Sequence, residues 1–391
     1  MQTAIVLGAG MVGSVMAADL AADFRVSIAD ARRSSLDAAV ARSGKLGRSV
    51  APLLADLSDA AALKRTVAPF DLVVGALSSR IGFNALRAVI EARKPYCDIS
   101  FFAQNALGLD GLAKEHGVTA VVDCGVAPGM SNMICGAEVA GFEGSGGAAE
   151  ALAIYVGGLP RRPEPPYFYK AAFAPSDVIE EYTRPVRIVE GGRTVVKEAL
   201  TEPEFLEFAG VGRLEAVNTD GLRSLADTLD VPSMKEKTLR YAGHYDLMRG
   251  LKAAGLFSEE EVDVGGTMIR PRDVTAALMF PEWTYAPGEE DLTVMRIIVE
   301  GTRAGKRERV TWDLCDVYDR AAGATSMSRT TGLACTGVAR MIADGRVREP
   351  GVIPPERLGR TPGILDSVVG MLRAKGIVYG RTVGSPGPAS A

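Results

Sequence analysis

A short glycine-rich segment near the start of the chain constrains the fold more than any other feature. The run Gly8-Ala9-Gly10-Met11-Val12-Gly13 follows an apolar stretch, Thr3–Leu7, and opens an alanine-rich segment that ends near Ala22. In a strand–turn–helix unit, the first glycine permits the tight turn, the second lets the backbone approach a pyrophosphate, and the third lets helix and strand pack closely. The helix N-terminus also favours a phosphate charge. A dinucleotide site is therefore predicted, with a purely structural turn as the alternative; its residues would be Gly8, Gly10, Met11, Val12 and Gly13.

The first 125 residues alternate short apolar runs with longer helical segments such as Val12–Ala22 and Phe83–Ala92. This alternation implies crossover connections and a parallel sheet. Six strands in this pattern match the Rossmann dinucleotide-binding fold, an α/β fold in which ligands lie at the carboxyl ends of the strands. The expected strands are Thr3–Leu7, Arg25–Ala29, Ser49–Leu53, Asp71–Ala76, Pro95–Ile99 and Thr119–Val122.

The residue that ends the second strand bears on which dinucleotide binds. A carboxylate there, Asp30, would bond the adenosine ribose hydroxyls and repel a 2′-phosphate, which favours NAD over NADP. Arg32 and Arg33 argue the other way, because arginines after this strand can hold a 2′-phosphate, although both would also suit a solvated helix start. We expect NAD, with Asp30, Ala31 and Arg32 at its adenosine end. Ser78 and Ser79, after the fourth strand, either contact the dinucleotide or cap a helix.

The pattern changes after Gly147. Two strand pairs, Thr183–Val189 with Arg193–Ala199 and Leu292–Glu300 with Lys306–Asp313, are separated by glycine-containing turns typical of hairpins. Hairpins indicate an antiparallel or mixed sheet, and therefore a second domain. Beyond it, Ser326–Asp344 is predicted to be a helix that ends at Gly345.

Composition excludes several functional classes. The net charge is −4 with mixed signs, so no basic surface for nucleic acid is expected. No apolar stretch approaches the roughly 20 residues that span a bilayer, and the N-terminus lacks signal-peptide features, so we expect a cytoplasmic protein without membrane contact. The five cysteines are scattered without a CxxC pair, and no metal site is expected.

Two loops at the predicted ligand edge carry the side chains of greatest chemical interest. One is Tyr96-Cys97-Asp98-Ile99-Ser100, and the other runs from Asp123 through Cys124, Pro128 and Gly129 to Asn132. Pro128 and Gly129 suit a bend into a helix whose N-terminus attracts an anion.

The two loops resemble those of the saccharopine dehydrogenase family, in which Tyr-Cys-Asp-Ile-Ser is followed about 25 residues later by Asp-Cys-Gly-Val-Ala-Pro-Gly. The resemblance covers nearly the whole chain in order. Within the family, the runs Asn218–Leu225 and Arg240–His244 are most similar to those of lysine 6-dehydrogenases. Other similar runs are Gly157–Pro160, Tyr182–Pro185, Lys237–His244 and Thr330–Gly332.

The resemblance implies a domain organisation. Residues 1–125 with about 325–384 would form the Rossmann domain, and about 126–324 an inserted α+β mixed-sheet domain for substrate binding, catalysis and dimerisation. Residues 385–391 would be a flexible tail. A homodimer or dimer of dimers is expected.

The implied reaction is oxidative deamination of the ε-amine of L-lysine. Hydride would pass to the nicotinamide, and water would convert the imine to 2-aminoadipate 6-semialdehyde, which cyclises to piperideine-6-carboxylate. The ε-ammonium, with a reference pKa near 10.4, must first lose a proton. Asp123 is the leading candidate for the base, with Cys97 as its neighbour; alternatively Asp123 caps the following loop. His244 is either catalytic or structural.

The substrate's carboxylate would need a guanidinium clamp. Arg240 is the first candidate, with Arg184 and Arg223 as alternates; Thr219 and Asp220 would orient the amino group, with Tyr182 nearby. Two other functions stay open. One is reductive condensation or oxidation of a secondary amine, as in saccharopine reductase or carboxynorspermidine dehydrogenase. The other is a non-enzymatic NAD-binding regulator.

Overall fold

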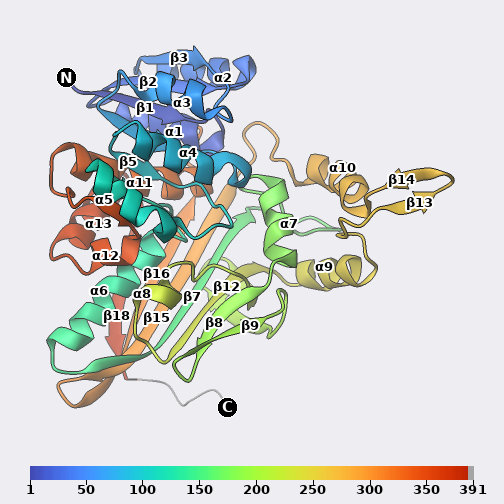
Figure 1. Cartoon of the computed structure of the whole chain (residues 1–391). Helices are drawn as coiled ribbons and strands as arrows, with labels where there is room; N and C mark the ends of the chain where they lie inside the picture. Colours follow the sequence, from blue (N-terminus) through green and yellow to red (C-terminus); the bar gives the residue numbers. More distant parts are fainter. Residues whose placement is uncertain (386–391) are drawn as a thin grey trace. The chain divides into compact units, whose positions relative to one another are not determined.

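The computed structural model describes residues 1–385 and divides the chain into two compact units. The first unit is formed by Met1–Gly144 and Asp319–Tyr379, and the second by Ser145–Tyr318 and the segment that starts at Gly380. Figure 1 shows the elements of both units. The tail was predicted for residues 385–391, of which 386–391 lie outside the described residues.

The first unit contains a parallel sheet with the strand order β17-β6-β5-β4-β1-β2-β3. Apart from β17, this is the order of the Rossmann fold, so the fold prediction is confirmed. All six predicted strands are present, whereas the three-residue strand β17 was not predicted. The strands are β1 (Thr3–Leu7), β2 (Arg25–Asp30), β3 (Val50–Leu54), β4 (Leu72–Gly75), β5 (Tyr96–Asp98), β6 (Thr119–Val121) and β17 (Gly351–Ile353).

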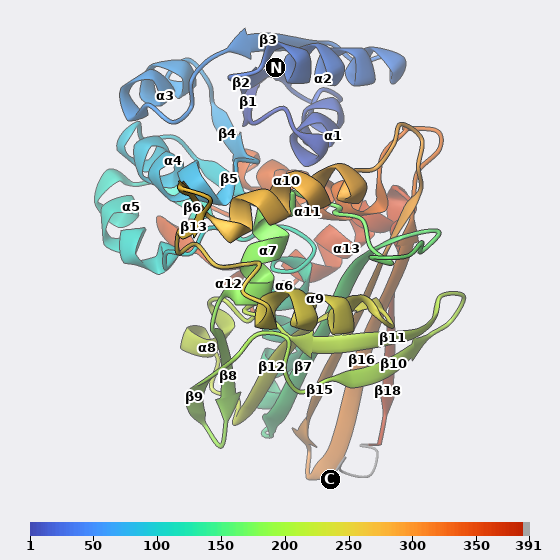
Figure 2. The same cartoon turned by 90° about the vertical axis from the view of Figure 1, so that its right-hand side faces the viewer.

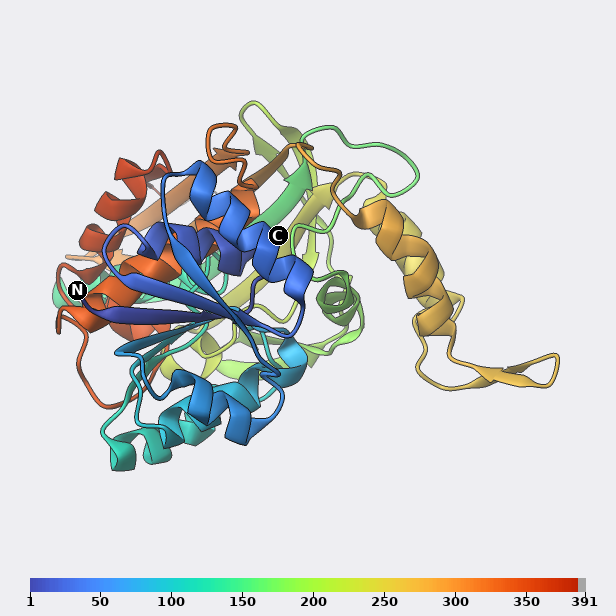
Figure 3. The ribbon, with the colours of Figure 1, turned by 90° about the horizontal axis from the view of Figure 1, so that it is seen from above.

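Helices cover both faces of this sheet, as Figure 3 shows from above. Helix α1 packs against α2 and α11 on one face, and α3, α4 and α5 pack in series on the other. Helix α6 packs against α12 and therefore groups with this unit, although it follows residue 125. The helices are α1 (Met11–Leu20), α2 (Arg33–Lys45), α3 (Ala60–Val67), α4 (Ser79–Glu91), η1 (Ala106–Leu109), α5 (Asp110–His116), α6 (Met130–Gly144), α11 (Ser326–Ala343), α12 (Pro355–Gly359) and α13 (Ile364–Ala374).

The second unit is built on a nine-stranded mixed sheet of order β10-β11-β12-β7-β15-β16-β18, with β8 and β9 attached through β12. Strands β12 and β7 are parallel, and the pairs β7–β15 and β15–β16 are antiparallel. The predicted mixed sheet is thus present. Its strands are β7 (Ala148–Pro160), β8 (Val186–Glu190), β9 (Arg193–Lys197), β10 (Glu204–Phe208), β11 (Gly212–Asn218), β12 (Ser233–Tyr241), β15 (Asp291–Arg303), β16 (Lys306–Val317) and β18 (Tyr379–Gly384).

Both predicted hairpins form. Strands β8 and β9 are joined through Gly191 and Gly192, which have φ of 57° and 74° and so occupy the left-handed region that glycine tolerates best. The prediction started the first strand at Thr183, but that residue ends helix α7 (Pro175–Thr183). Strands β15 and β16 extend further than predicted, and turn at Ala304 and Gly305.

A lobe of helices carries a second core in this unit. Helices α7, α9 (His244–Ala253) and α10 (Pro271–Trp283) contribute aromatic side chains to one buried cluster. The small helix α8 (Leu225–Thr228) lies beside β8. Next to α10, a separate two-stranded sheet joins β13 (Val262–Val264) to β14 (Thr267–Ile269); Figure 2 shows it in a second view.

Among residues 1–385, none of the helices combines the length and the apolar character that a membrane crossing requires.

Candidate active site

The glycine-rich turn between β1 and α1 has the geometry of a dinucleotide cradle. A Cβ atom at Gly8 would lie 2.3 Å from the Ala76 carbonyl oxygen, and one at Gly13 would lie 1.9 Å from the Gly8 carbonyl oxygen. Packing therefore requires the first and third glycines. A Cβ at Gly10 would meet nothing within 4 Å, which leaves room for a pyrophosphate to approach. No side chain caps the start of α1 at Met11, so the first helical N–H groups can receive an anion.

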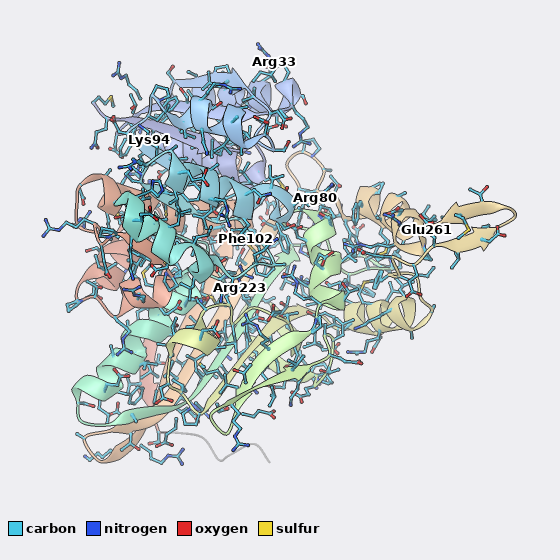
Figure 4. The ribbon with its side chains drawn as sticks, viewed as in Figure 1. Arg33, Arg80, Lys94, Phe102, Arg223 and Glu261 are labelled. Carbon is cyan, nitrogen blue, oxygen red and sulfur yellow. The ribbon has the colours of Figure 1, made fainter. Side chains whose placement is uncertain are left out.

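The Asp30 carboxylate is already engaged within the chain. Its Oδ2 accepts a hydrogen bond from the Ala9 N–H at 2.8 Å, and its Oδ1 accepts one from the Arg32 N–H at 2.8 Å. The Arg32 side chain is 73% exposed, with its Nε 3.7 Å from Asp30 Oδ1. Arg33 lies beside it at the start of α2, also exposed (Figure 4). Both guanidinium groups are exposed, that of Arg33 with its Nε 3.1 Å from Asp37 Oδ1, and the charge of the Asp30 carboxylate is partly compensated by Arg32.

The loop after β4 is held by a buried carboxyl group that sequence reasoning missed. The Leu77 N–H donates to Ser100 Oγ at 3.0 Å, and that hydroxyl donates to Asp98 Oδ1 at 2.7 Å. Burial raises the pKa of Asp98 to about 6. Ser78 occupies the N-cap position of α4 but makes no side-chain cap, and Ser79 is the first helical residue. The signal for Asp98 was its place in the Tyr96–Ser100 run.

Asp123 and Cys97 lie at the carboxyl ends of neighbouring strands, β6 and β5. Asp123 is 5% exposed and has φ of 50°, an uncommon conformation for an aspartate that turns the chain sharply after the strand. The Cys97 thiol is fully buried, 3.4 Å from Cys335 Sγ, and burial raises its pKa. It is therefore a neutral thiol that packs against Cys335, not an activated nucleophile.

In the second unit, three predicted residues form one buried network. Arg240 Nε donates to the Tyr182 hydroxyl at 3.3 Å, and the Tyr182 hydroxyl lies 2.8 Å from His244 Nε2. The guanidinium also lies over the Tyr169 ring, 4.4 Å from its centroid. Its Nη2 is 3.5 Å from both the Tyr169 hydroxyl and Glu181 Oε2, the long limit of a hydrogen bond.

The proton positions on His244 follow from its partners. Nδ1 is 2.8 Å from the Tyr167 carbonyl oxygen, which can only accept, so Nδ1 carries the proton and Nε2 accepts from Tyr182. Burial lowers the pKa of His244 to about 3, with the Arg240 charge acting in the same direction. The imidazole is therefore neutral, and both of its nitrogens are occupied.

Carboxyl groups from three elements lie near one another here: Glu236 on β12 is buried, whereas Glu181 on α7 and Asp220 after β11 are partly buried. Glu236 is 4% exposed, and its Oε2 accepts from the Thr219 hydroxyl at 2.6 Å. Burial raises the pKa of Glu236 to about 8 and that of Glu181 to about 7. The Glu236 pKa is raised further by Glu181 and Asp220, so Glu236 keeps its proton at neutral pH. A Cβ at Gly221 would lie 2.3 Å from the Glu236 carboxyl, which explains the glycine after Asp220.

The remaining predicted arginines lie at the margins of this network. Arg184 follows α7, with Nη2 3.9 Å from Glu180 Oε2. Arg223 is 7% exposed between β11 and α8 (Figure 4), and its carbonyl accepts from Arg187 Nη2 at 3.3 Å. Asp220 Oδ1 accepts from the Arg187 N–H at 3.3 Å.

The structure thus groups the predicted residues into two sets. The cofactor residues, Asp123 and Cys97 belong to one sheet edge of the first unit, and the substrate residues with His244 belong to the second unit. Within residues 1–385, no three His, Cys, Asp or Glu side chains are arranged to hold a metal ion.

Comparison with known families gives two matches that together span most of the chain. The family model "Saccharopine dehydrogenase NADP binding domain" matches residues 4–121, and "Saccharopine dehydrogenase C-terminal domain" matches residues 125–377.

Curated relatives agree with these matches. The chain is 22% identical to the NADP(+)-dependent, L-glutamate-forming saccharopine dehydrogenase of Schizosaccharomyces pombe, over 80% of this chain and 85% of that protein. It is 24% identical to the mitochondrial alpha-aminoadipic semialdehyde synthase of Bos taurus, over 81% of this chain but 41% of that protein. The structure of apo saccharopine dehydrogenase (L-Glu forming) from Saccharomyces cerevisiae shares the fold, with a TM-score of 0.79 and 19% identity, over 98% of this chain and 100% of that one.

The expectation of NAD was wrong. The matching N-terminal domain is an NADP-binding one, and the similar saccharopine dehydrogenases of Schizosaccharomyces pombe and Pyricularia oryzae are NADP(+) enzymes. The physical reason lies in the Asp30 contacts: its oxygens bond the backbone of Ala9 and Arg32, and the adjacent guanidinium groups of Arg32 and Arg33 can offset a 2′-phosphate. An acidic residue at the end of the second strand does not by itself exclude NADP.

The fold, the glycine cradle and the two family matches lead to one assignment: the chain is an oxidoreductase that belongs to the saccharopine dehydrogenase family.

Proposed function

We propose that the protein oxidises the ε-amine of L-lysine with NADP as hydride acceptor. The observation that carries this proposal is a group of carboxyl groups, buried Glu236 with partly buried Glu181 and Asp220, in the same unit as the deeply buried guanidinium of Arg240. A small amino acid with a second amine complements such a site, because it has one carboxylate and two cationic groups.

In this proposal Arg240 binds the substrate's carboxylate. Its two Nη2 contacts are long, so a carboxylate can replace them at little cost and gain a charge-assisted, bidentate geometry. Tyr182 and neutral His244 fix the guanidinium plane through the chain of hydrogen bonds from the Tyr167 carbonyl. His244 is thus a positioning residue and not a proton donor or acceptor.

The α-ammonium group would face Glu236 and Asp220. A cation beside Glu236 lowers the raised pKa of that carboxyl group, so binding releases a proton from Glu236. Below about pH 8 this release opposes binding. We therefore expect kcat/KM for lysine to rise between pH 6 and 8, a rise that Glu236→Gln would reduce.

Asp123 would accept the proton from the ε-ammonium before oxidation. Bound NADP supplies a hydride acceptor, held by the turn Gly8–Gly13 and by Arg32 and Arg33. The ε-carbon would lose a hydride while the nitrogen lone pair forms the C=N bond, and the proton released earlier by the ammonium group would stay on the base. Water then adds to the imine and releases ammonia, leaving the 6-semialdehyde, which closes on its own α-amine.

A second candidate is the oxidation of saccharopine, favoured by the names of the relatives that align over most of their length. Saccharopine carries three carboxylates, so it would need guanidinium groups in addition to Arg240. Arg223 and Arg184 are the side chains of this unit that could supply them.

Initial rates of NADPH formation with lysine and with saccharopine separate the candidates. Turnover of lysine with release of ammonia supports the proposal. Turnover of saccharopine alone, with glutamate as a product and a KM raised by Arg223→Ala, would replace it with the second candidate. No NADPH from either amine would refute both.

A further inference from the structure

The turn after β5 connects a buried carboxyl group to the loop that follows the neighbouring strand β4. Asp98 Oδ1 accepts hydrogen bonds from the Ser100 N–H at 2.9 Å and from the Ser100 hydroxyl at 2.7 Å. The Ser100 hydroxyl in turn accepts a hydrogen bond from the Leu77 N–H at 3.0 Å. These three residues are here named the Asp98 relay. Asp98 itself is fully buried, so the relay links an interior charge to the backbone of the loop.

The loop at the far end of the relay forms one wall of the glycine cradle. A Cβ atom at Gly8 would lie 2.3 Å from the Ala76 carbonyl oxygen and 3.5 Å from Leu77 Cδ2, and one at Gly13 would lie 3.3 Å from Ala76 Cβ. The Ala76 N–H also donates to the Leu7 carbonyl oxygen at 2.8 Å. The first and third glycines of the cradle thus pack against the loop that the relay holds, so a shift of Leu77 changes the shape of the cradle.

The chain forms the same turn at a second place, after β3. Asp56 Oδ1 accepts from the Ser58 N–H at 2.9 Å and from the Ser58 hydroxyl at 2.6 Å. Both residues are exposed, and the bonds from Ser58 lower the pKa of Asp56. Asp98 makes the equivalent bonds to Ser100, but burial outweighs them and raises its pKa to about 6. Burial and the link to Leu77 therefore distinguish the Asp98 relay from an ordinary local turn.

The ionisable groups around Asp98 come from its own strand, from the loop after β6 and from α11. The Asp123 carboxylate raises the Asp98 pKa further, whereas the Tyr96 hydroxyl acts in the opposite direction. The Cys335 thiol on α11 also interacts with the Asp98 charge. Asp98 Oδ2 is buried and has no hydrogen-bond partner among residues 1–385, so it can take up a proton without breaking a bond.

Strand β4 and helix α4 present glycines to the same turn. A Cβ atom at Gly75 would lie 2.4 Å from Asp98 Oδ1. One at Gly82 would lie 2.8 Å from Ser100 Cβ and 3.0 Å from the ring of Phe102, which Figure 4 labels. The contacts from these two elements carry no charge, and a side chain at either glycine would displace the relay.

Ionisation of Asp98 changes how firmly the loop is held. A carboxylate accepts hydrogen bonds more strongly than a neutral carboxyl group does. Charged Asp98 also polarises the Ser100 hydroxyl, which then accepts more strongly from the Leu77 N–H. The wall of the cradle is therefore held more firmly above the Asp98 pKa of about 6 than below it.

We propose that Asp98 is a positioning residue that makes the affinity of the glycine cradle for NADP depend on pH, acting through Ser100 and Leu77. The affinity rises as Asp98 loses its proton. This assignment rests on NADP binding at the turn Gly8–Gly13 and not on which amine the protein oxidises.

Calorimetric titration of the full chain with NADP, without any amine, tests the proposal between pH 5 and 8. Asp98→Asn keeps an oxygen that accepts from Ser100 but removes the charge, so it reproduces the neutral state at every pH. The ratio of its Kd to the wild-type Kd should be about 5 at pH 8 and should approach 1 at pH 5, because charge-assisted hydrogen bonds are about twice as strong as neutral ones. This ratio cancels the ionisation of the 2′-phosphate itself, whose pKa is about 6.

A Kd ratio that stays constant with pH, or one below 1 at pH 8, would overturn the proposal. Wild type that does not bind NADP at all would instead refute the cradle, so the two failures are distinguishable. Asp56→Asn is the matched control, because Asp56 makes the same two bonds outside the relay, and its Kd should equal that of the wild type at every pH. A change equal to that of Asp98→Asn would mean that net charge, and not the relay, sets the affinity.

Ser100→Ala tests whether Asp98 acts through the relay. It removes the hydroxyl group that the Leu77 N–H donates to and leaves every carboxyl group in place, so it also serves if Asp98→Asn fails to fold. NADP binding at pH 8 should weaken, and adding Asp98→Asn should then have no further effect. Additive effects of the two changes would show that the residues act independently and would contradict the relay.

Asp123→Asn tests the charge that faces Asp98. Because Asp123 raises the Asp98 pKa, its removal should move the midpoint of the pH dependence to a lower pH. The midpoint is measured from the ratio of Kd values for Asp98→Asn/Asp123→Asn and Asp123→Asn. An unchanged or higher midpoint would contradict the pairing of the two carboxyl groups.

Discussion

The two units differ in how each would hold a charged ligand. The first unit uses backbone: three glycines, a helix N-terminus without a cap, and hydrogen bonds from Ala9 and Arg32 that fix Asp30. The second unit uses buried side chains of strand β12, where Arg240 is held by the phenol groups of Tyr182 and Tyr169 and Glu236 by the Thr219 hydroxyl. A backbone site costs little in stability, whereas a site of buried charges makes folding depend on pH and on every partner.

The largest effect is expected at Asp123, the proposed catalytic base. Asp123→Asn should lower kcat with lysine by about 10³-fold, because a positioned base contributes 10²–10⁴-fold. NADPH binding, followed by its fluorescence, should be retained, since the glycine cradle does not use this side chain. Equal loss of turnover and of NADPH binding would mean that Asp123 holds the loop and not the proton.

The comparison predicts that the buried carboxyl group of Glu236 makes the stability of the protein depend on pH. Between about pH 4.5 and 8 the unfolded chain has released the Glu236 proton and the folded chain has kept it, so the free energy of unfolding falls as pH rises. Between pH 5.5 and 8, Glu236→Gln should remove about 3 kcal/mol of this dependence. Urea unfolding at pH 5.5 and 8 measures it, with exposed Glu261→Gln as the control. Equal slopes in wild type and Glu236→Gln would show that the group titrates normally.

Replacing Arg240, the proposed clamp for the substrate's carboxylate, should affect the binding of lysine and not that of NADP. Arg240→Lys keeps the charge but loses the planar fork, so KM for lysine should rise by about 10–100-fold while KM for NADP stays constant. His244→Gln should produce a smaller rise in the same constant without a new ionisation in the pH profile. If Arg240→Lys leaves KM for lysine unchanged, Arg223 or Arg184 becomes the candidate clamp.

The smallest effect on kinetics is expected from the exposed arginines beside the dinucleotide cradle. Arg32→Ala/Arg33→Ala should raise KM for NADP by about 10-fold and leave KM for NAD nearly unchanged, because the lost contacts are with the 2′-phosphate and are screened by solvent. Arg193→Ala, an exposed arginine of the second unit, is the control. A parallel rise for NAD and NADP would mean that the two arginines contact the shared part of the dinucleotide.

The same difference between the two units explains which features could be predicted from the sequence. The dinucleotide cradle of the first unit is made by residues that are neighbours in the sequence. The turn Gly8–Gly13 and all six strands could therefore be predicted from the local sequence pattern. Asp98 was missed because it holds the loop after β4 through Ser100, which accepts a hydrogen bond from the distant Leu77. Glu236 and Glu181 were missed because their environments depend on strand register and on helix packing. The cofactor preference was misjudged at Asp30 because the sequence does not show that backbone N–H groups occupy its oxygens.

The most direct test of the central proposal uses lysine deuterated at C6 as the sole amine with NADP. The account predicts NADPD, identified by mass spectrometry, together with release of ammonia. Unlabelled NADPH, with deuterium retained in the product, would show that the hydride leaves another carbon and would contradict oxidation at the ε-position.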